Sequence, residues 1–138
     1  GHGVRLGAAR RRSIEDISQR IAEKEAKVLA AAGIAAPDRF FNMLAAHDIV
    51  GKNLGLGDHF AFDTNPFAQS DARYILITGK DAVKAMQNPD IKNDRRIWVV
   101  EYQTQLDPYL IQFVVEKLTD AAERKHIDIV PPTEEITH

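Results

Sequence analysis

The 138-residue chain contains no cysteine. This absence excludes disulfides, thiol nucleophiles and thiolate metal sites, and it suits a reducing compartment. Long apolar runs are missing as well, since none approaches the roughly 18 residues that a membrane-spanning helix needs. Neither sign of charge dominates, because the formal net charge is −2, so no global field draws the chain to nucleic acid or acidic lipid. We therefore expect a cytoplasmic protein without a membrane segment.

A recognisable phosphate-binding loop is also absent. The stretch VGKNLGLGDHFAFD at 50–63 is rich in glycine, but a P-loop needs GxxxxGK followed by Ser or Thr between a strand and a helix. Here Lys52 directly follows Gly51, and the glycines at 51, 55 and 57 do not fit GxGxxG. We interpret them as a helix stop and a turn, followed by a short strand within DHFAFD.

Catalytic and metal-binding patterns are equally scarce. The His and Asp residues of the same region show neither HxxxH nor EF-hand spacing. No serine lies in a GxSxG motif. The sequence therefore predicts no catalytic residue, no metal and no cofactor, and it disfavours an enzyme.

An alternation of apolar elements is the clearest positive feature. The sequence predicts strands at 74–77, 97–102 and 127–130, with helices at 81–86 and 107–125 between them. A further helix is expected from Pro37 to about 47. This order favours an α/β fold with a small, mostly parallel sheet of three to four strands flanked by helices.

An amphipathic helical arm is predicted ahead of this domain. Ser13 and Asp16 approximate a capping box, and apolar residues then recur at helical spacing up to a stop at Gly33. The apolar positions are Ile14, Ile17, Ile21 and Val28. The pattern predicts one helix over 14–32. The expected segments are a cloning remnant and basic lead-in at 1–12, the arm at 13–36, the α/β domain at 37–132 and a tail at 133–138.

The leading functional hypothesis is a non-catalytic protein–protein interaction or adaptor domain within a larger protein or assembly. It rests on the missing catalytic pattern and on the thin apolar stripe of the arm. In this interpretation Ile14, Ile17, Ile21 and Val28 bind a protein partner or a second copy of the chain. The structural alternative is that the helix packs on its own domain and its apolar residues belong to the core.

The competing hypothesis is a small-molecule or nucleotide-binding domain, possibly enzymatic, that uses the crevice at the carboxyl ends of the strands. The candidate ligand-binding residues are Thr78, Gly79, Lys80, Glu101, Thr104 and Asp107. Thr78 and Lys80 could hold an anion, while Glu101 could act as acid or base. Helix capping and turn formation also explain these residue types.

Nucleic-acid binding is the weakest of the three interpretations. Arg10, Arg11 and Arg12 form a short basic run, and Arg95 and Arg96 lie close to Trp98. Neither group belongs to a known nucleic-acid-binding motif, and the chain has no net positive charge. A solvated turn is the simpler explanation of the second group.

Overall fold

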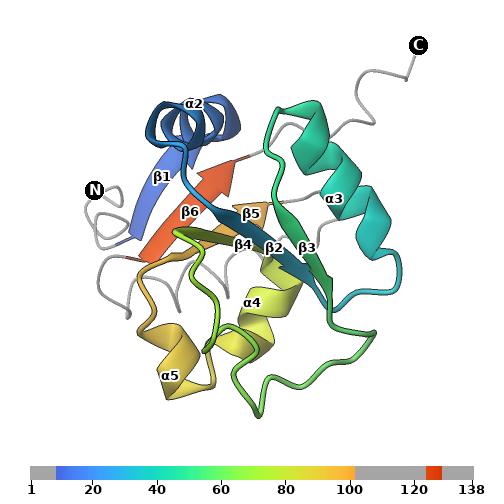
Figure 1. Cartoon of the computed structure of the whole chain (residues 1–138). Coiled ribbons are helices and arrows are strands. Elements are labelled where there is room, and N and C mark those ends of the chain that lie inside the picture. Colours follow the sequence, from blue (N-terminus) through green and yellow to red (C-terminus); the bar gives the residue numbers. More distant parts are fainter. Residues whose placement is uncertain (1–8, 102–123, 129–138) are drawn as a thin grey trace, which may run out of the picture.

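A parallel β-sheet forms the centre of the protein (Figure 1). The computed structural model describes residues 9–101 and 124–128. Within these residues the strands follow the order β1-β6-β5-β4-β2-β3, and each neighbouring pair is parallel. The strands are β1 (Ala9–Ser13), β2 (Val28–Ala32), β3 (Lys52–Gly55), β4 (Tyr74–Thr78), β5 (Ile97–Glu101) and β6 (Arg124–Asp128). The described helices are α2 (Ile14–Lys24), α3 (Pro37–Ala46), α4 (Gly79–Ala85) and α5 (Pro89–Lys92).

The predicted α/β fold, with a mostly parallel sheet flanked by helices, is confirmed. The sheet is larger than expected because β1, β2 and β3 join the strands that the sequence revealed. None of the helices in the described ranges is both long and apolar enough to cross a bilayer.

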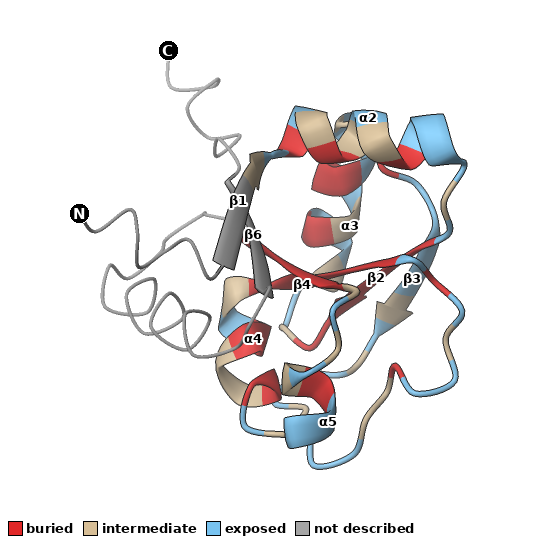
Figure 2. Ribbon diagram, turned by 90° about the vertical axis from the view of Figure 1, so that its left-hand side faces the viewer, coloured by how far each residue is buried: buried red, intermediate tan, exposed pale blue. Residues whose placement is uncertain are grey.

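Two apolar layers hold the helices against the sheet. On one face Leu76 and Trp98 pack with the buried sides of α2 and α3. On the other face Ile75 and Ile97 pack with α4, α5 and the segment that precedes β4. Successive strand residues point to opposite faces, which is why β4 and β5, buried on both faces, are apolar up to their last residues, Thr78 and Glu101. Figure 2 shows α2 and α3 on one side of the strands, and α4 and α5 on the other.

The N-terminal helix is shorter than predicted. Ser13 caps it as expected, since its hydroxyl accepts a hydrogen bond from the Asp16 amide at 3.0 Å. The helix then ends at Lys24, because Glu25 adopts a left-handed conformation with φ 50°. Val28 consequently lies in β2, in the interior of the sheet, and not on the helix.

The four apolar residues proposed to bind a partner lie in the protein's own core. Ile14, Ile17 and Ile21 are buried on the face of α2 that packs toward the sheet, and Val28 is buried in β2. Figure 2 shows buried segments on the side of α2 that faces the strands. This packing agrees with the alternative that the apolar residues of the helix pack on the protein's own domain.

Two further predictions need correction. Residues 58–63 form no strand, and the strand of this region is β3, which begins at Lys52. Most of the helix predicted at 107–125 lies outside the described residues, but its last two positions, Arg124 and Lys125, belong to β6.

Candidate functional site

The most promising site lies where β2, β3 and β4 end. The chain leaves β2 through α3 toward the outer strand β3, whereas it leaves β4 through α4 and α5 toward β5 on the opposite side. Such a reversal between two adjacent parallel strands is a topological switch point, and ligands of open α/β sheets bind in the crevice beside it. We call this region the carboxyl edge, made of residues 33–36, 56–62 and 78–81.

A buried carboxylate connects the two strands at the switch point. Asp81 is 1% exposed, and its two oxygens lie 3.2 and 3.1 Å from the amide nitrogen of Gly33, directly after β2. Its Oδ2 also accepts a hydrogen bond from the Thr78 hydroxyl at 2.8 Å. Thr78 Oγ1 in turn accepts from the Asp81 amide at 3.1 Å and so caps α4. The carboxylate therefore joins the end of β2 to the end of β4.

Burial raises the pKa of the Asp81 carboxyl above the usual aspartate value of 3.8. Loss of hydration disfavours the charged form. The hydrogen bonds from Gly33 and Thr78, and the charges of Lys84 and Lys80, act in the opposite direction without cancelling this effect. Keeping the charged Asp81 carboxylate buried in the folded state therefore costs free energy.

Gly33 is the point at which three loops meet. It is buried, and a Cβ added to it would lie 3.1 Å from Asp81 Oδ1, 3.2 Å from the Gly57 carbonyl oxygen and 3.3 Å from Phe60 Cβ. The Leu56 amide also donates to the Ala32 carbonyl at 2.9 Å, which carries the pairing of β2 and β3 up to this edge. The 56–62 loop is therefore packed directly against the end of β2.

The 56–62 loop has an unusual backbone. Gly57, His59 and Phe62 have φ values of 90°, 67° and 61°. Left-handed conformations are uncommon for residues other than glycine, and such strain tends to gather at functional sites. The loop is held by Lys84 Nζ, which donates to the Phe60 carbonyl at 3.4 Å, and by Asn88 Nδ2, which donates to the Phe62 carbonyl at 3.0 Å.

His59 is the site candidate that the sequence did not single out. Its side chain is 88% exposed, and Nε2 lies 3.5 Å from Asp58 Oδ2. The surrounding aromatic residues are packed, with Phe60 and Phe62 ring centroids 4.8 Å apart in an edge-to-face arrangement. A fixed loop thus presents an imidazole to solvent beside the switch point. Nothing in the sequence predicts that His59 adopts a left-handed backbone conformation.

The residues predicted to bind a ligand divide into three groups. Thr78 is 4% exposed and is engaged with Asp81, while Gly79 and Lys80 follow it at the start of α4, with Lys80 exposed. Glu101 ends β5, one residue beyond Val100, the register partner of Thr78, and so reaches the same edge. Thr104 and Asp107 lie outside the described residues.

No group of three or more metal-ligating side chains occurs in the part of the chain that the structure describes. Besides the buried Thr78 and Asp81, the carboxyl edge carries the ammonium group of Lys80, the imidazole of His59 and the carboxylate of Asp58.

A cavity of about 520 Å³ lies at the opposite, amino-terminal edge of the sheet. Apolar residues including Leu29, Leu54 and Ala72 line it, together with Lys52. Val50, also part of its lining, is 73% exposed. Its lining also holds the charged pair Lys27 and Asp71, and it shares no residue with the carboxyl edge.

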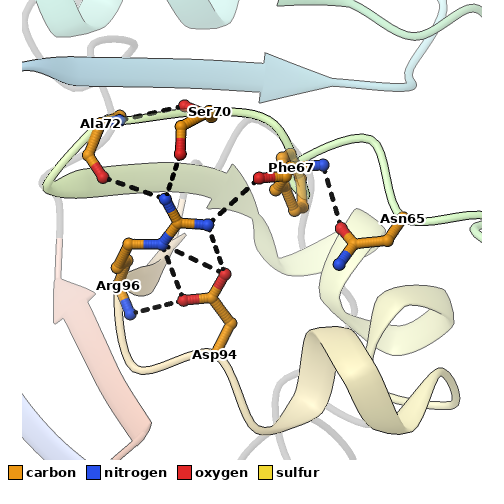
Figure 3. A network of polar contacts seen from close by, with 6 residues as sticks. All are labelled: Asn65, Phe67, Ser70, Ala72, Asp94 and Arg96. Atoms are coloured by element: carbon orange, nitrogen blue, oxygen red, sulfur yellow. Dashed lines mark hydrogen bonds and ion pairs between the residues drawn. The ribbon is translucent and has the colours of Figure 1, made fainter.

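Arg96 binds the backbone of Ser70 and Ala72, two residues that line that cavity, and Figure 3 shows its polar contacts. Its Nη1 donates to the carbonyls of Ser70 (2.6 Å) and Ala72 (3.2 Å), and its Nη2 donates to that of Phe67 (3.1 Å). The Asp94 carboxylate receives the remaining bonds, from Nε at 3.0 Å and from Nη2 at 2.8 Å. The guanidinium of Arg96, considered above as a possible contact to nucleic acid, is thus hydrogen-bonded to groups of the protein itself.

The family model for tetraacyldisaccharide-1-P 4'-kinase, LpxK, matches residues 4–119. The chain belongs to this family. It is 50% identical over 91 residues to the tetraacyldisaccharide 4'-kinase of Janthinobacterium sp. (strain Marseille), and 48% identical over 93 residues to that of Herminiimonas arsenicoxydans. These matches cover 66% and 67% of this chain but 26% of each relative, so the chain spans about a quarter of their length. No solved structure gives a significant match.

Membership of a kinase family overturns the adaptor hypothesis. The prediction of a protein–protein interaction domain with a protein partner or self-association was wrong, and the alternative of a ligand-binding, possibly enzymatic domain agrees better with the match. The error arose because the nucleotide-binding signatures sought in the sequence are absent from these 138 residues. The stripe on α2, taken as a binding surface, is core.

Proposed function

We propose that this chain forms part of a tetraacyldisaccharide 4'-kinase and that its carboxyl edge contributes to the site of phosphoryl transfer. The observation that carries the proposal is the family match over residues 4–119. The switch point supports the location, because open α/β sheets bind ligands there. A kinase of this type consumes a nucleoside triphosphate, so we propose the cytoplasm as its compartment.

The chemistry of phosphoryl transfer explains what this edge could supply. The acceptor hydroxyl attacks the γ-phosphorus, and catalysis depends mainly on positioning and on stabilising the charge of the phosphate oxygens. Lys80 is an exposed cation at this edge, and His59 is an exposed group able to take a proton from an acceptor hydroxyl. Gly79 leaves open space beside the start of α4, since a Cβ there would meet nothing within 4 Å.

Among the remaining candidates, we assign Thr78 a supporting role, because its hydroxyl both donates to and accepts from Asp81. Glu101, Thr104 and Asp107 stay candidates for contacts from the loop after β5.

A chimeric kinase tests this proposal. The present chain replaces the segment that it matches in the Janthinobacterium relative, and transfer of radiolabelled phosphate from ATP to tetraacyldisaccharide 1-phosphate is measured. We expect the chimera to keep activity within about tenfold of the parent, which corresponds to a rise of less than roughly 1.4 kcal/mol in the activation barrier. The parent lacking the segment should be inactive. A folded but inactive chimera would reject the proposed function.

His59→Asn in the chimera tests the location of the site. Asparagine tolerates a left-handed backbone, so the loop is kept while the imidazole is lost. We expect kcat to fall by about 10²- to 10⁴-fold, as for loss of a general base. Asp63→Asn, an exposed change nearby, is the matched control and should leave kcat unchanged. Equal rates for the two variants would move the site away from this loop.

A further inference from the structure

We propose that Asp81 is a positioning residue for phosphoryl transfer, because its carboxylate fixes the end of β2, the end of β4 and the 56–62 loop in one geometry. This inference rests on the proposed function. Asp81 itself is 1% exposed, so it acts through its neighbours and not by touching a substrate. Its carboxylate has two hydrogen-bond donors, the Gly33 amide directly after β2 and the Thr78 hydroxyl at the end of β4. β2 and β4 are the two strands that flank the switch point.

The bonding pattern requires an acceptor at both carboxylate oxygens. Gly33 N lies almost equally far from Oδ1 and Oδ2, at 3.2 and 3.1 Å, and so donates to both. An asparagine keeps one oxygen and replaces the other with a donor. With its oxygen bound to Thr78, the new amino group at the Oδ1 position would face the Gly33 amide at about the same separation, and two donors repel each other. Gly33 must then shift.

A shift of Gly33 is transmitted because the space around it is already filled. The ideal Cβ position of this glycine is 3.2 Å from the Gly57 carbonyl oxygen and 3.3 Å from Phe60 Cβ. His59 lies between these two residues in the chain, in a left-handed conformation. On the other side, Lys84 of α4 binds the Phe60 carbonyl. The loop is thus clamped between the end of β2 and a helix that Asp81 itself anchors.

The cost of a small displacement in a transferase is large. A misplacement of about 1 Å in a reacting group can lower a rate by about 10²-fold. Burying a carboxylate is unfavourable unless it is well bonded, and an apolar residue of similar size would avoid that cost. A requirement for precise geometry at this edge accounts for keeping the carboxylate.

Asp81→Asn in the chimeric kinase, with steady-state kinetics, tests the inference. We expect kcat to fall at least about tenfold with KM changed less than about threefold, because the substrate contacts remain and only their alignment is lost. Asp38→Asn, an exposed carboxylate in the first turn of α3, is the matched control and should leave both constants unchanged. Asp81→Glu, which retains both acceptors, should recover part of kcat.

Hydrogen exchange of the full 138-residue chain supplies an activity-independent readout. Asp81→Asn should speed exchange at Gly33 and at residues 57–60, while the amides of β5 keep their protection. An unchanged kcat, a matching rise in KM, or exchange altered throughout the sheet would overturn the positioning role. An inactive chimera that carries no substitution would overturn the proposed function, and with it the catalytic part of this inference, even where the local exchange effect is present.

Discussion

At the scale of single residues, Arg96 and Asp81 show two uses of a buried or half-buried charge. Arg96 employs its fixed fork of donors to gather the carbonyls of residues 67, 70 and 72 around one point. Asp81 does the converse and gathers donors around a carboxylate. Arg96 thereby organises the loop before β4, whereas Asp81 joins the ends of β2 and β4. Each can be tested by a change that keeps size while altering hydrogen bonding.

Arg96→Lys should destabilise the protein by about 2–3 kcal/mol. Lysine keeps the charge, but a single ammonium cannot reach three carbonyls and a carboxylate at once; hydrogen bonds to charged groups are worth about 1.5–3 kcal/mol each. The free energy of unfolding in urea measures the effect. Arg73→Lys, an exposed arginine, should stay within about 0.5 kcal/mol of the wild type. A loss at residue 96 no larger than this control would show that the network contributes little.

Asp81 should make stability depend on pH in a direction opposite to most carboxylates. Because its folded pKa is raised above 3.8, the folded state binds the proton more readily than the unfolded state. Stability therefore falls as pH rises from 3.8 through the folded pKa, and it is regained on acidification. Relative to Asp81→Asn, the wild type should gain thermal stability as pH is lowered from 7 toward 4. A constant difference between the two melting curves would contradict this assignment.

At the scale of elements, the sequence revealed those parts whose signals are local. The runs at 74–77 and 97–100 consist of aliphatic and aromatic residues, as expected for buried parallel strands, and Pro37 correctly predicted the start of α3. β2 was missed because VLAAA contains three alanines, which favour helices, and continues the helical spacing of the residues before it. Nothing in the residue type of Glu25 signals the left-handed turn that ends α2.

The candidate site was predictable only in part. The carboxyl ends of β4 and β5 follow from the strand pattern, so Thr78, Lys80 and Glu101 were placed at one edge. The contribution of residue 33 and of the 56–62 loop depends on β2 and β3 lying beside β4, a tertiary arrangement that single-residue propensities do not encode. His59 was therefore weighed among the possible metal ligands of its region.

Two glycines of one region should respond oppositely to alanine. A Cβ at Gly51 would lie 2.4 Å from the Val28 carbonyl oxygen and 2.8 Å from Val28 Cβ, so Gly51→Ala must push β3 away from β2. We expect a loss of about 1–3 kcal/mol in denaturant unfolding. Gly55→Ala, at the other end of β3, meets nothing within 4 Å and should be neutral or slightly stabilising. Equal effects would mean that β2 and β3 are less closely packed than described.

The cap of α2 offers a second test at this scale. Ser13→Ala removes the acceptor for the Asp16 amide and should cost about 1 kcal/mol. Ser13→Asp keeps an acceptor at the same position and should retain most of the stability. Thermal melts of the two variants compare them directly, and equal losses would show that the cap is not what stabilises the start of α2.

At the scale of the whole molecule, the sheet has two roles, which are to supply the core and to form the carboxyl edge. The strands β2, β4 and β5 are buried and supply the core, while the reversal of the chain between β2 and β4 creates the carboxyl edge. The chain spans about a quarter of the length of its curated relatives. The kinetic tests therefore use the chimera, which supplies the rest of the relative's chain.

The pairing of β1 with β6 has a consequence for how the protein is made. β1 is the first described strand to leave the ribosome, yet its neighbour in the sheet is the last. On the order of 100 residues separate them, so at roughly 5–20 residues per second the partner arrives about 5–20 s later. During that interval β1 is an unpaired edge, the kind of segment that joins strands of other chains. The three consecutive arginines that it carries, Arg10 to Arg12, place like charges on every nascent copy and oppose such pairing.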